Sequence, residues 1–171
     1  WRIFTGGDLT GDAKSKPLTF LVSTPLIAAD DPWFTYASRE DRFALNLPAQ
    51  PTVEAFTYVS EYGSPWQARR HTAEYEGFTH RMTVVDMNTA QSDSVSSGFE
   101  KRGAMAFAAA NLRKTGEVIL DTYDQVQVIP GMKLEIILPD GRLNLVEIHI
   151  YDGLLYVQES ISPVDEIPAY D

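Results

Sequence analysis

Alternation between apolar and polar residues is the dominant pattern of this chain after residue 30. Short runs rich in Leu, Ile, Val, Phe and Tyr are separated by turn-forming residues, which is typical of strands joined by hairpins. The pattern predicts an antiparallel meander. The expected strands are FALNLP, EAFTYVS, WQARRHTAEY, FTHRMTVVD, EVILDTYDQVQVI, MKLEIIL, LNLVEIHIY and LLYVQES, and the expected turns are PAQP, YGSP, EG, PG, PDG and DG.

Two Asp-Gly pairs, Asp140-Gly141 and Asp152-Gly153, predict tight turns in the last third of the chain. Both residue types tolerate the left-handed backbone that such turns require. Residues from about 132 to 160 should therefore form a three-stranded meander with one dry and one wet face. Alternation places Met132, Leu134, Ile136 and Leu138 on the dry face, and Lys133 and Glu135 on the other.

One segment, SSGFEKRGAMAFAAANLRKTG, follows a helical period instead. Ser97 and Glu100 have the spacing of a capping box, and Gly116 follows the last turn. We expect a helix from about 98 to 114 packed on one face of the sheet, which makes the predicted fold class α+β. The residues expected to face the sheet are Phe99, Gly103, Ala106, Phe107 and Ala110.

The 171 residues carry a net charge of −10 and include no cysteine. An acidic chain is unsuited to nucleic acid and to anionic lipid, which both require basic surfaces. The lack of cysteine excludes disulfides, thiol nucleophiles and iron–sulfur clusters. The length suits one domain, which we expect over 30–163, between an N-terminal extension, 1–29, and an acidic C-terminal tail, 164–171.

The stretch KSKPLTFLVSTPLIAADDPW has two interpretations. Lys14 and Lys16, the apolar run Leu18 to Ile27 and the small pair Ala28-Ala29 follow the outline of an export signal. LTFLVST is also a good short strand, and this structural interpretation is preferred. About ten apolar residues are too few to span a bilayer as a helix. We expect an exported, periplasmic protein without a transmembrane segment, and a cytoplasmic protein is the open alternative.

Histidines are the only candidates for catalysis or metal binding besides carboxylates. If Glu76-Gly77 is a two-residue turn, His71 and His80 are diagonal neighbours on one face, about 7–8 Å apart. A metal site would need a third or fourth ligand, and that face of the hairpin offers no obvious carboxylate. The structural interpretation is therefore preferred for both. His149 should point away from the apolar side formed by its neighbours, Ile148 and Ile150. We predict no catalytic residue, no metal and no cofactor.

The order FTYASREDRFALNLPAQPTVEAF, RMTVVD, helix, GMKLEIILPDGRLNLVEIHIYDGLLYVQES resembles small exported bacterial proteins of unknown function. Phe43, Pro48 and Pro51 match their Phe-x-x-x-x-Pro-x-x-Pro element. More distantly, the order resembles the PsbP-like α+β fold of extrinsic subunits of photosynthetic membranes. The resemblance covers about 30–163 and implies no catalytic residues.

These observations favour a non-catalytic protein-interaction or assembly module that docks on a protein or a membrane-associated complex. Trp1, Phe4 and Trp33 are the expected partner-binding residues, because aromatic anchors dominate interfaces. Residues 1–12 should be ordered by another chain, and the alternative is that they fold back on their own sheet. The second hypothesis is a small-molecule-binding protein or a hydrolase that uses His71 and His80.

Overall fold

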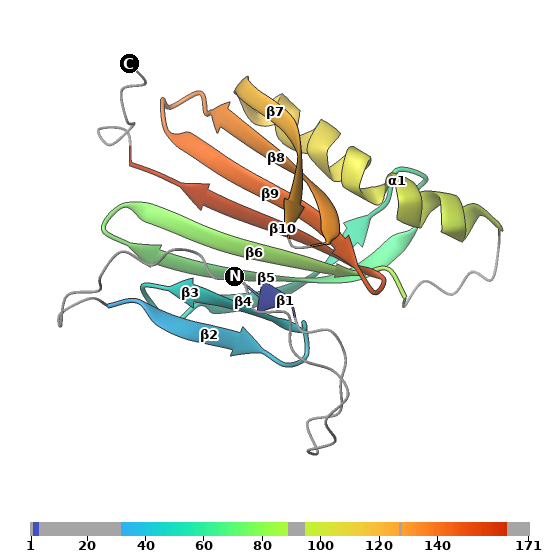
Figure 1. The fold of residues 1–171 in the computed structure, drawn as a ribbon, viewed down its shortest axis with the longest axis horizontal. Coiled ribbons are helices and arrows are strands. Elements are labelled where there is room, and N and C mark those ends of the chain that lie inside the picture. The colour runs from blue at the N-terminus through green and yellow to red at the C-terminus, as the bar shows by residue number, and fades with distance from the viewer. Residues whose placement is uncertain (1, 4–31, 89–94, 127, 164–171) are drawn as a thin grey trace.

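A computed structural model of the protein describes residues 2–3, 32–88, 95–126 and 128–163. Its centre is a seven-stranded sheet in the order β4-β5-β6-β10-β9-β8-β7, in which every neighbouring pair is antiparallel (Figure 1). The strands are β4 (Thr52–Val59), β5 (Pro65–Tyr75), β6 (Phe78–Asp86), β7 (Glu117–Val126), β8 (Ile129–Ile137), β9 (Leu143–Tyr151) and β10 (Leu154–Ile161).

A second, three-stranded sheet lies beside the large one, in the order β1-β3-β2 (Figure 1). It consists of β1 (Arg2–Ile3), β2 (Phe34–Ser38) and β3 (Phe43–Leu47). The helix α1 (Val95–Leu112), continued by the 3-10 turn η1 (Arg113–Thr115), lies on the other side of the large sheet. The large sheet is thus the middle layer of three.

Each face of the large sheet has its own core, because successive side chains of a strand point to opposite faces. Ala104, Ala108 and Ala109 of α1 pack on one face, among residues such as Trp66 and Val85. The small sheet covers the other face. There Phe43, Leu45 and Leu47 of β3 pack against Met82, Val84 and Tyr156.

The C-terminal meander is confirmed. The strands β8, β9 and β10 pair in sequence, and Leu134 and Ile136 are fully buried on the face that was expected to be dry. Asp152 and Gly153 both have positive φ, 48° and 73°, as a two-residue hairpin requires. Glu76-Gly77 is a turn of the same kind, so the predicted register of β5 and β6 is correct.

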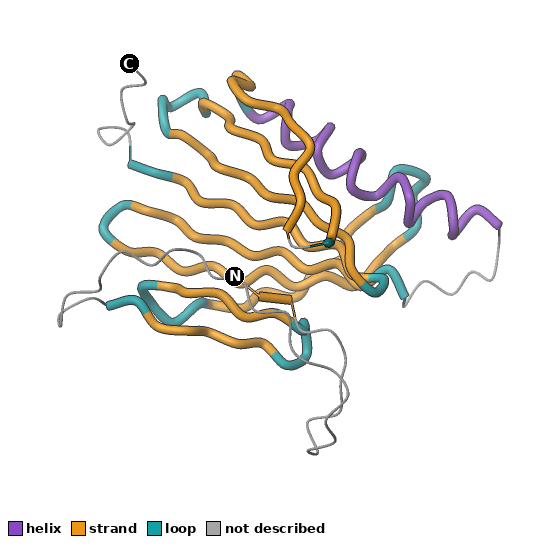
Figure 2. The backbone as a smooth tube through the Cα atoms, viewed as in Figure 1, coloured by secondary structure: helices purple, strands orange, loops and turns teal. Residues whose placement is uncertain are grey.

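The predicted fold class is confirmed only for the antiparallel sheet. Strands make up most of the described chain, which has a single helix of 18 residues, so the protein is mostly β and not α+β (Figure 2). The helix begins at Val95 and not at 98. Its predicted contact face was partly wrong: Phe107 packs on Tyr58 of the sheet, but Ala106 is exposed while Ala104 and Ala108 are buried.

Two predicted turns are wrong. Pro130 and Gly131 lie inside β8, opposite Gln125 and Asp124 of β7. Gly131 is a strand glycine because the ring of His149 occupies the space where a side chain would begin. A Cβ on Gly131 would lie 2.2 Å from His149 Cε1. The segment PAQP is not a hairpin either, because it carries the chain from β3 in the small sheet to β4 in the large one.

The N-terminal residues that the structure describes fold back on their own chain. Arg2 pairs with Ala44 and Ile3 with Phe43, so for these two residues the alternative of self-packing holds. Trp1, Phe4, the stretch from 14 to 29 and the tail 164–171 lie outside the described residues. Within the described ranges, no helix is long and apolar enough to cross a membrane.

Candidate functional site

The turn between β2 and β3 carries Asp41 into the space between the two sheets. Ser38 and Phe43 close the hairpin, and Arg42 takes a left-handed conformation with φ 57°. The Ser38 hydroxyl accepts a hydrogen bond from the Asp41 backbone N–H at 3.1 Å, which fixes the turn. The Asp41 side chain is only 3% exposed, so its carboxylate needs partners inside the protein.

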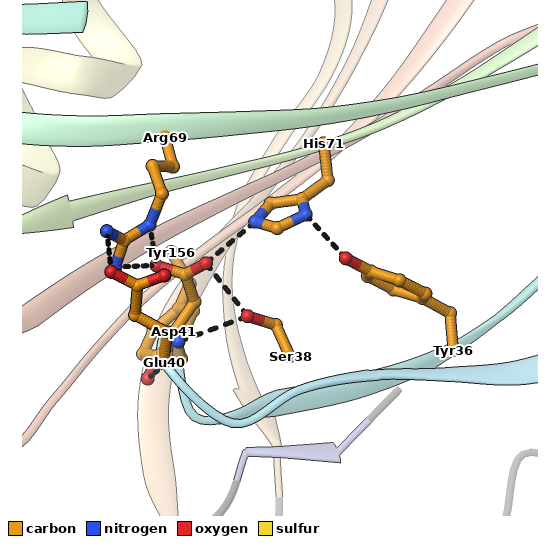
Figure 3. Close-up of polar contacts among 7 residues, drawn as sticks. All are labelled: Tyr36, Ser38, Glu40, Asp41, Arg69, His71 and Tyr156. Carbon is orange, nitrogen blue, oxygen red and sulfur yellow. Dashed lines mark hydrogen bonds and ion pairs between the residues drawn. The ribbon is translucent and has the colours of Figure 1, made fainter. Parts of the chain in front are cut away.

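Both carboxylate oxygens of Asp41 have such partners (Figure 3). Oδ1 accepts a hydrogen bond from Arg69 Nε at 2.8 Å and lies 2.7 Å from Arg69 Nη2. Oδ2 accepts from the Ser38 hydroxyl at 2.9 Å and lies 2.8 Å from His71 Nε2. Because Arg69 and His71 both belong to β5, Asp41 fastens the small sheet to the large one.

His71 is the centre of a relay of three side chains. An ionised carboxylate can only accept, so His71 Nε2 carries the hydrogen that is shared with Asp41. In the neutral ring Nδ1 is then an acceptor, and the Tyr36 hydroxyl, 3.0 Å away, donates to it. Figure 3 shows the imidazole ring between Asp41 and Tyr36, with both of its nitrogens engaged.

Asp41 and Tyr36 keep their charge states near neutral pH. Burial alone would raise the pKa of Asp41, but hydrogen bonds from His71, Arg69 and Ser38 and the charge of Arg69 lower that pKa to about 2. Burial and the nearby Asp41 charge raise the pKa of Tyr36. Tyr36 therefore keeps its proton. The Tyr36 hydroxyl, the His71 imidazole and the Asp41 carboxylate follow one another as hydroxyl, base and orienting acid do in nucleophilic catalysis, but the raised pKa of Tyr36 opposes ionisation of its hydroxyl.

A pocket of about 370 Å³ opens beside this network. Its arginines are already paired with carboxylates: Arg69 with Glu40 and Asp41, and Arg42 with Asp152. The pocket therefore presents no unpaired arginine to an anionic substrate. It is lined by Glu40, Asp41, Arg42, Ala55, Gln67, Ala68, Arg69, Val84, Asp86 and Leu154.

His71 and His80 share one face of the hairpin, as the predicted register requires. Both lie on the face toward the small sheet, yet His80 contacts other groups: its Nδ1 lies 2.9 Å from the Ser160 hydroxyl, and Trp33 packs edge-on at 5.2 Å. Burial lowers the pKa of His80. No group of three or more His, Cys, Asp or Glu side chains in the described part of the chain could hold a metal.

The two remaining candidates are His149 and Trp33. His149 does point away from Ile148 and Ile150, but it is completely buried, because that face of the sheet is a second core and not a wet surface. Burial lowers the pKa of His149, although Glu147, Asp124 and a backbone hydrogen bond at Pro130 oppose the shift. Trp33 is 40% exposed and packs on His80 of its own chain.

Strand β4 has an open outer edge, since none of the described strands pairs with it there. The turn to β5 shows which residues of β4 bond to β5 through their backbone and which direct their N–H and C=O groups outward. Ser60 N–H donates to Ser64 at 2.9 Å, and bonded and non-bonded pairs alternate along an antiparallel ladder. The pair Val59–Pro65 is thus non-bonded, in agreement with the missing N–H of proline. The backbone groups that point outward are those of Val53, Ala55, Thr57 and Val59.

The outer edge of β4 lacks the features that usually protect an edge strand. Glu54 is its one charged residue, and its pairing with β5 contains no bulge. The opposite edge strand, β7, has three acidic residues and a bulge between Val118 and Leu120. Bulges and charges are the usual means by which proteins prevent edge pairing. On β4 the side chains of Val53 and Val59 are instead 52% and 57% exposed.

Sequence reasoning missed both the Asp41 network and the open edge. The hairpin of β5 and β6 offered no carboxylate close to His71, because the carboxylate comes from another sheet. The available signal was local: Ser38 three residues before Asp41 is a pattern typical of a side chain that caps a turn.

A scan against models of protein families, a search of curated proteins and a search of solved structures each find no match for this chain.

Proposed function

We propose that this protein is a non-catalytic protein-interaction module that associates with another polypeptide by strand addition at β4. The single observation that carries the proposal is the open edge of β4, with alternate backbone groups directed outward and two valines half exposed. In strand addition, main-chain hydrogen bonds supply affinity and alternate side chains supply specificity. An unprotected edge that served no partner would be an aggregation hazard.

We infer a structural role for the relay of Tyr36, His71 and Asp41. Every nitrogen and carboxylate oxygen in it is occupied, and Tyr36 holds its proton. The network joins the two sheets. It thereby holds the small sheet over β5 and leaves β4 beyond it accessible from the side.

We further propose that the protein is exported and docks on a membrane-associated complex. The support is the signal-like outline of residues 14–29 and the resemblance to small exported proteins and the PsbP-like fold. Fractionation of the source cells tests it: the protein should appear in the compartment outside the inner membrane, and recovery in the cytoplasm would contradict export.

Amide hydrogen exchange resolved by residue tests the role of β4. In the free protein, amides of Val53, Ala55 and Thr57 should exchange fast, whereas those of Glu54 and Phe56, bonded to β5, should be protected. With the partner bound, the outward amides should gain protection. If these outward amides stay fast in the native complex, the partner binds elsewhere and the proposal is wrong.

A pair of variants at Thr57 provides the matched control. Thr57→Pro removes an outward N–H and no bond to β5, so the fold should persist while strand addition is lost. Thr57→Val keeps the N–H and should bind normally. Affinity purification from source cells should recover the same partner with wild type and Thr57→Val but not with Thr57→Pro. Equal recovery with all three would reject β4 as the binding strand.

The pocket beside Asp41 favours a second candidate, a small-molecule-binding protein. Its volume of about 370 Å³ falls in the range of ligand sites, and Asp41 has a perturbed pKa. His80 would take no part, since it has other neighbours. Gln67→Trp would fill the pocket from its exposed rim. A panel of small polar metabolites is screened for compounds that raise the melting temperature. A compound that stabilises the wild type but not Gln67→Trp would support this function, and a panel that contains no such compound would contradict it.

A further inference from the structure

We propose that the chain that occupies the edge of β4 is a second copy of this protein, related by a two-fold axis, so that two large sheets join into one. The inference rests on the proposed function, because it assumes that β4 is a strand for association. It adds the partner and the register of pairing.

Only alternate residues of β4 direct their N–H and C=O groups outward, and this restricts how two copies can pair. In an antiparallel pair, hydrogen-bonded positions must bring together residues whose N–H and C=O groups both point outward. On β4 these are the odd-numbered residues from Val53 to Val59. Odd residues must therefore face odd residues of the second copy, which excludes every register that places an odd residue opposite an even one.

The ends of β4 select one of the remaining registers. Pro51 precedes the strand, and the turn that begins at Ser60 follows it. Centring the axis on Ala55 would place Val59 opposite Pro51, which has no N–H to donate. Centring it on Thr57 would place Val53 opposite Glu61 in the turn. Centring it on Phe56 is the arrangement in which all four outward residues pair.

The side chains agree with the axis at Phe56. Val53 then faces Val59 of the second copy, and Ala55 faces Thr57, so the exposed valines cover each other on one face of the joined sheet. On the other face the two Phe56 rings meet at the axis, in a non-bonded pair, where Cα atoms are closest. Cross-strand pairs of aromatic and β-branched residues are favourable pairs in sheets.

The charge distribution also agrees with this axis. Glu54 would lie opposite Tyr58 and not opposite the other Glu54. The two copies of Glu54, the only charged side chain of β4, are therefore not placed opposite each other. Within its own chain Glu54 lies 4.0 Å from Arg70. Each copy carries a net charge of −10, so long-range repulsion remains. Added salt, which screens that repulsion, should strengthen the dimer.

Mass measurement on the intact chain is the first test. Sedimentation of the wild type and of Thr57→Val should give twice 19.1 kDa at high protein concentration, whereas Thr57→Pro should remain at 19.1 kDa. A wild type that stays at 19.1 kDa up to its solubility limit, at low and high salt, would overturn the inference. A Thr57→Pro variant that is still dimeric would overturn the assignment to β4.

Cysteine cross-linking tests the register, because the chain has no cysteine of its own. Phe56→Cys places two sulfurs across the axis at a Cα separation of about 4.5 Å, which suits a disulfide. Ala55→Cys is the matched control, since its mate lies diagonally, about 7–8 Å away. Oxidation should cross-link Phe56→Cys and leave Ala55→Cys uncross-linked. The reverse result would overturn the register. Far-UV circular dichroism checks that each variant is folded. If Phe56→Cys is unfolded, the mass of the wild type remains the test of the dimer.

The two proposals can fail separately. If the wild type is a monomer, and Thr57→Pro fails to bind a different protein that the wild type binds, only the proposal of a second copy at β4 is contradicted. If the outward amides exchange fast in every state and Thr57→Pro changes neither mass nor binding, both proposals are wrong.

Discussion

Replacing Asp41 by Asn is the change that most directly tests the network between the sheets. The variant keeps the size of the side chain but removes its charge. One of the two oxygens becomes an NH₂ group, which can only donate. Asp41 accepts from Arg69 on one side and from His71 and Ser38 on the other. If the NH₂ group faces Arg69, a donor meets a donor; if it faces the other side, the His71 ring must change its tautomer and the Ser38 hydroxyl must turn to accept.

The magnitude follows from the pKa of Asp41. The folded value of about 2 lies below the ordinary 3.8, and at 1.36 kcal/mol per pH unit this difference is about 2 kcal/mol of stability. Because the folded pKa is the lower one, the unfolded chain takes up the proton first as pH falls. The contribution is complete above about pH 5 and is lost as pH falls through about 4 to 2. Asp41→Asn should therefore lower the free energy of unfolding at pH 7 by about 2 kcal/mol or more.

Urea denaturation at several pH values measures this. The wild type should lose stability more steeply than Asp41→Asn between pH 4 and 2, and the two curves should approach each other at the acid end. Asp140→Asn is the control, since Asp140 forms an Asp–Arg pair with Arg142 on the surface. It should change stability by no more than about 0.5 kcal/mol. Parallel pH curves for wild type and Asp41→Asn would refute the reasoning.

Three further predictions concern glycines and a buried histidine. Gly116→Ala should destabilise by about 1–3 kcal/mol, because its Cβ would lie 2.1 Å from the backbone oxygen of Ile137. Gly103→Ala, within α1, should stabilise by up to about 1 kcal/mol, because its Cβ would make only an ordinary contact of 3.4 Å with Glu61 Oε2. Thermal unfolding distinguishes the two signs. Gly153→Val should cost more than about 1 kcal/mol, since φ is +73° and Asn88 fills the space beside it, and an unchanged urea midpoint would contradict this. His149 has a pKa below 6.5, so folding should weaken as pH falls below about 6.5, and His149→Phe should make the loss between pH 7 and 5 shallower.

The parts of the fold that could be predicted from sequence are those set by neighbours in the chain. The turns at Glu76-Gly77 and Asp152-Gly153 fix the register of their strands, and alternation then assigns faces correctly over β8. The helix face was misplaced because alanines occupy several sides of α1, and small apolar residues alone do not mark which side is buried. Gly131 looked like a turn residue because its real neighbour, His149, lies 18 positions further along the chain.

The site depended on contacts that no local pattern contains. His71 and Asp41 are thirty positions apart and belong to different sheets, so periodicity along β5 placed the imidazole on the correct face but could not supply its carboxylate. The same applies to the wet and dry faces. Alternation in β9 correctly turned His149 away from Ile148, yet only the arrangement of layers shows that a second core lies on that side.

The missed link between β3 and β4 and the proposed interaction strand have one physical origin. PAQP was read as a hairpin turn, which would have given β4 a neighbour on each side. Instead the chain passes from the small sheet to the large one at this point, and Pro48 and Pro51 flank the crossing. A strand entered from another sheet has no hairpin partner before it in sequence, and among the described strands β4 pairs with β5 alone. The crossing that brings Asp41 over His71 is therefore the same feature that leaves the outward N–H and C=O groups of β4 available to a second chain.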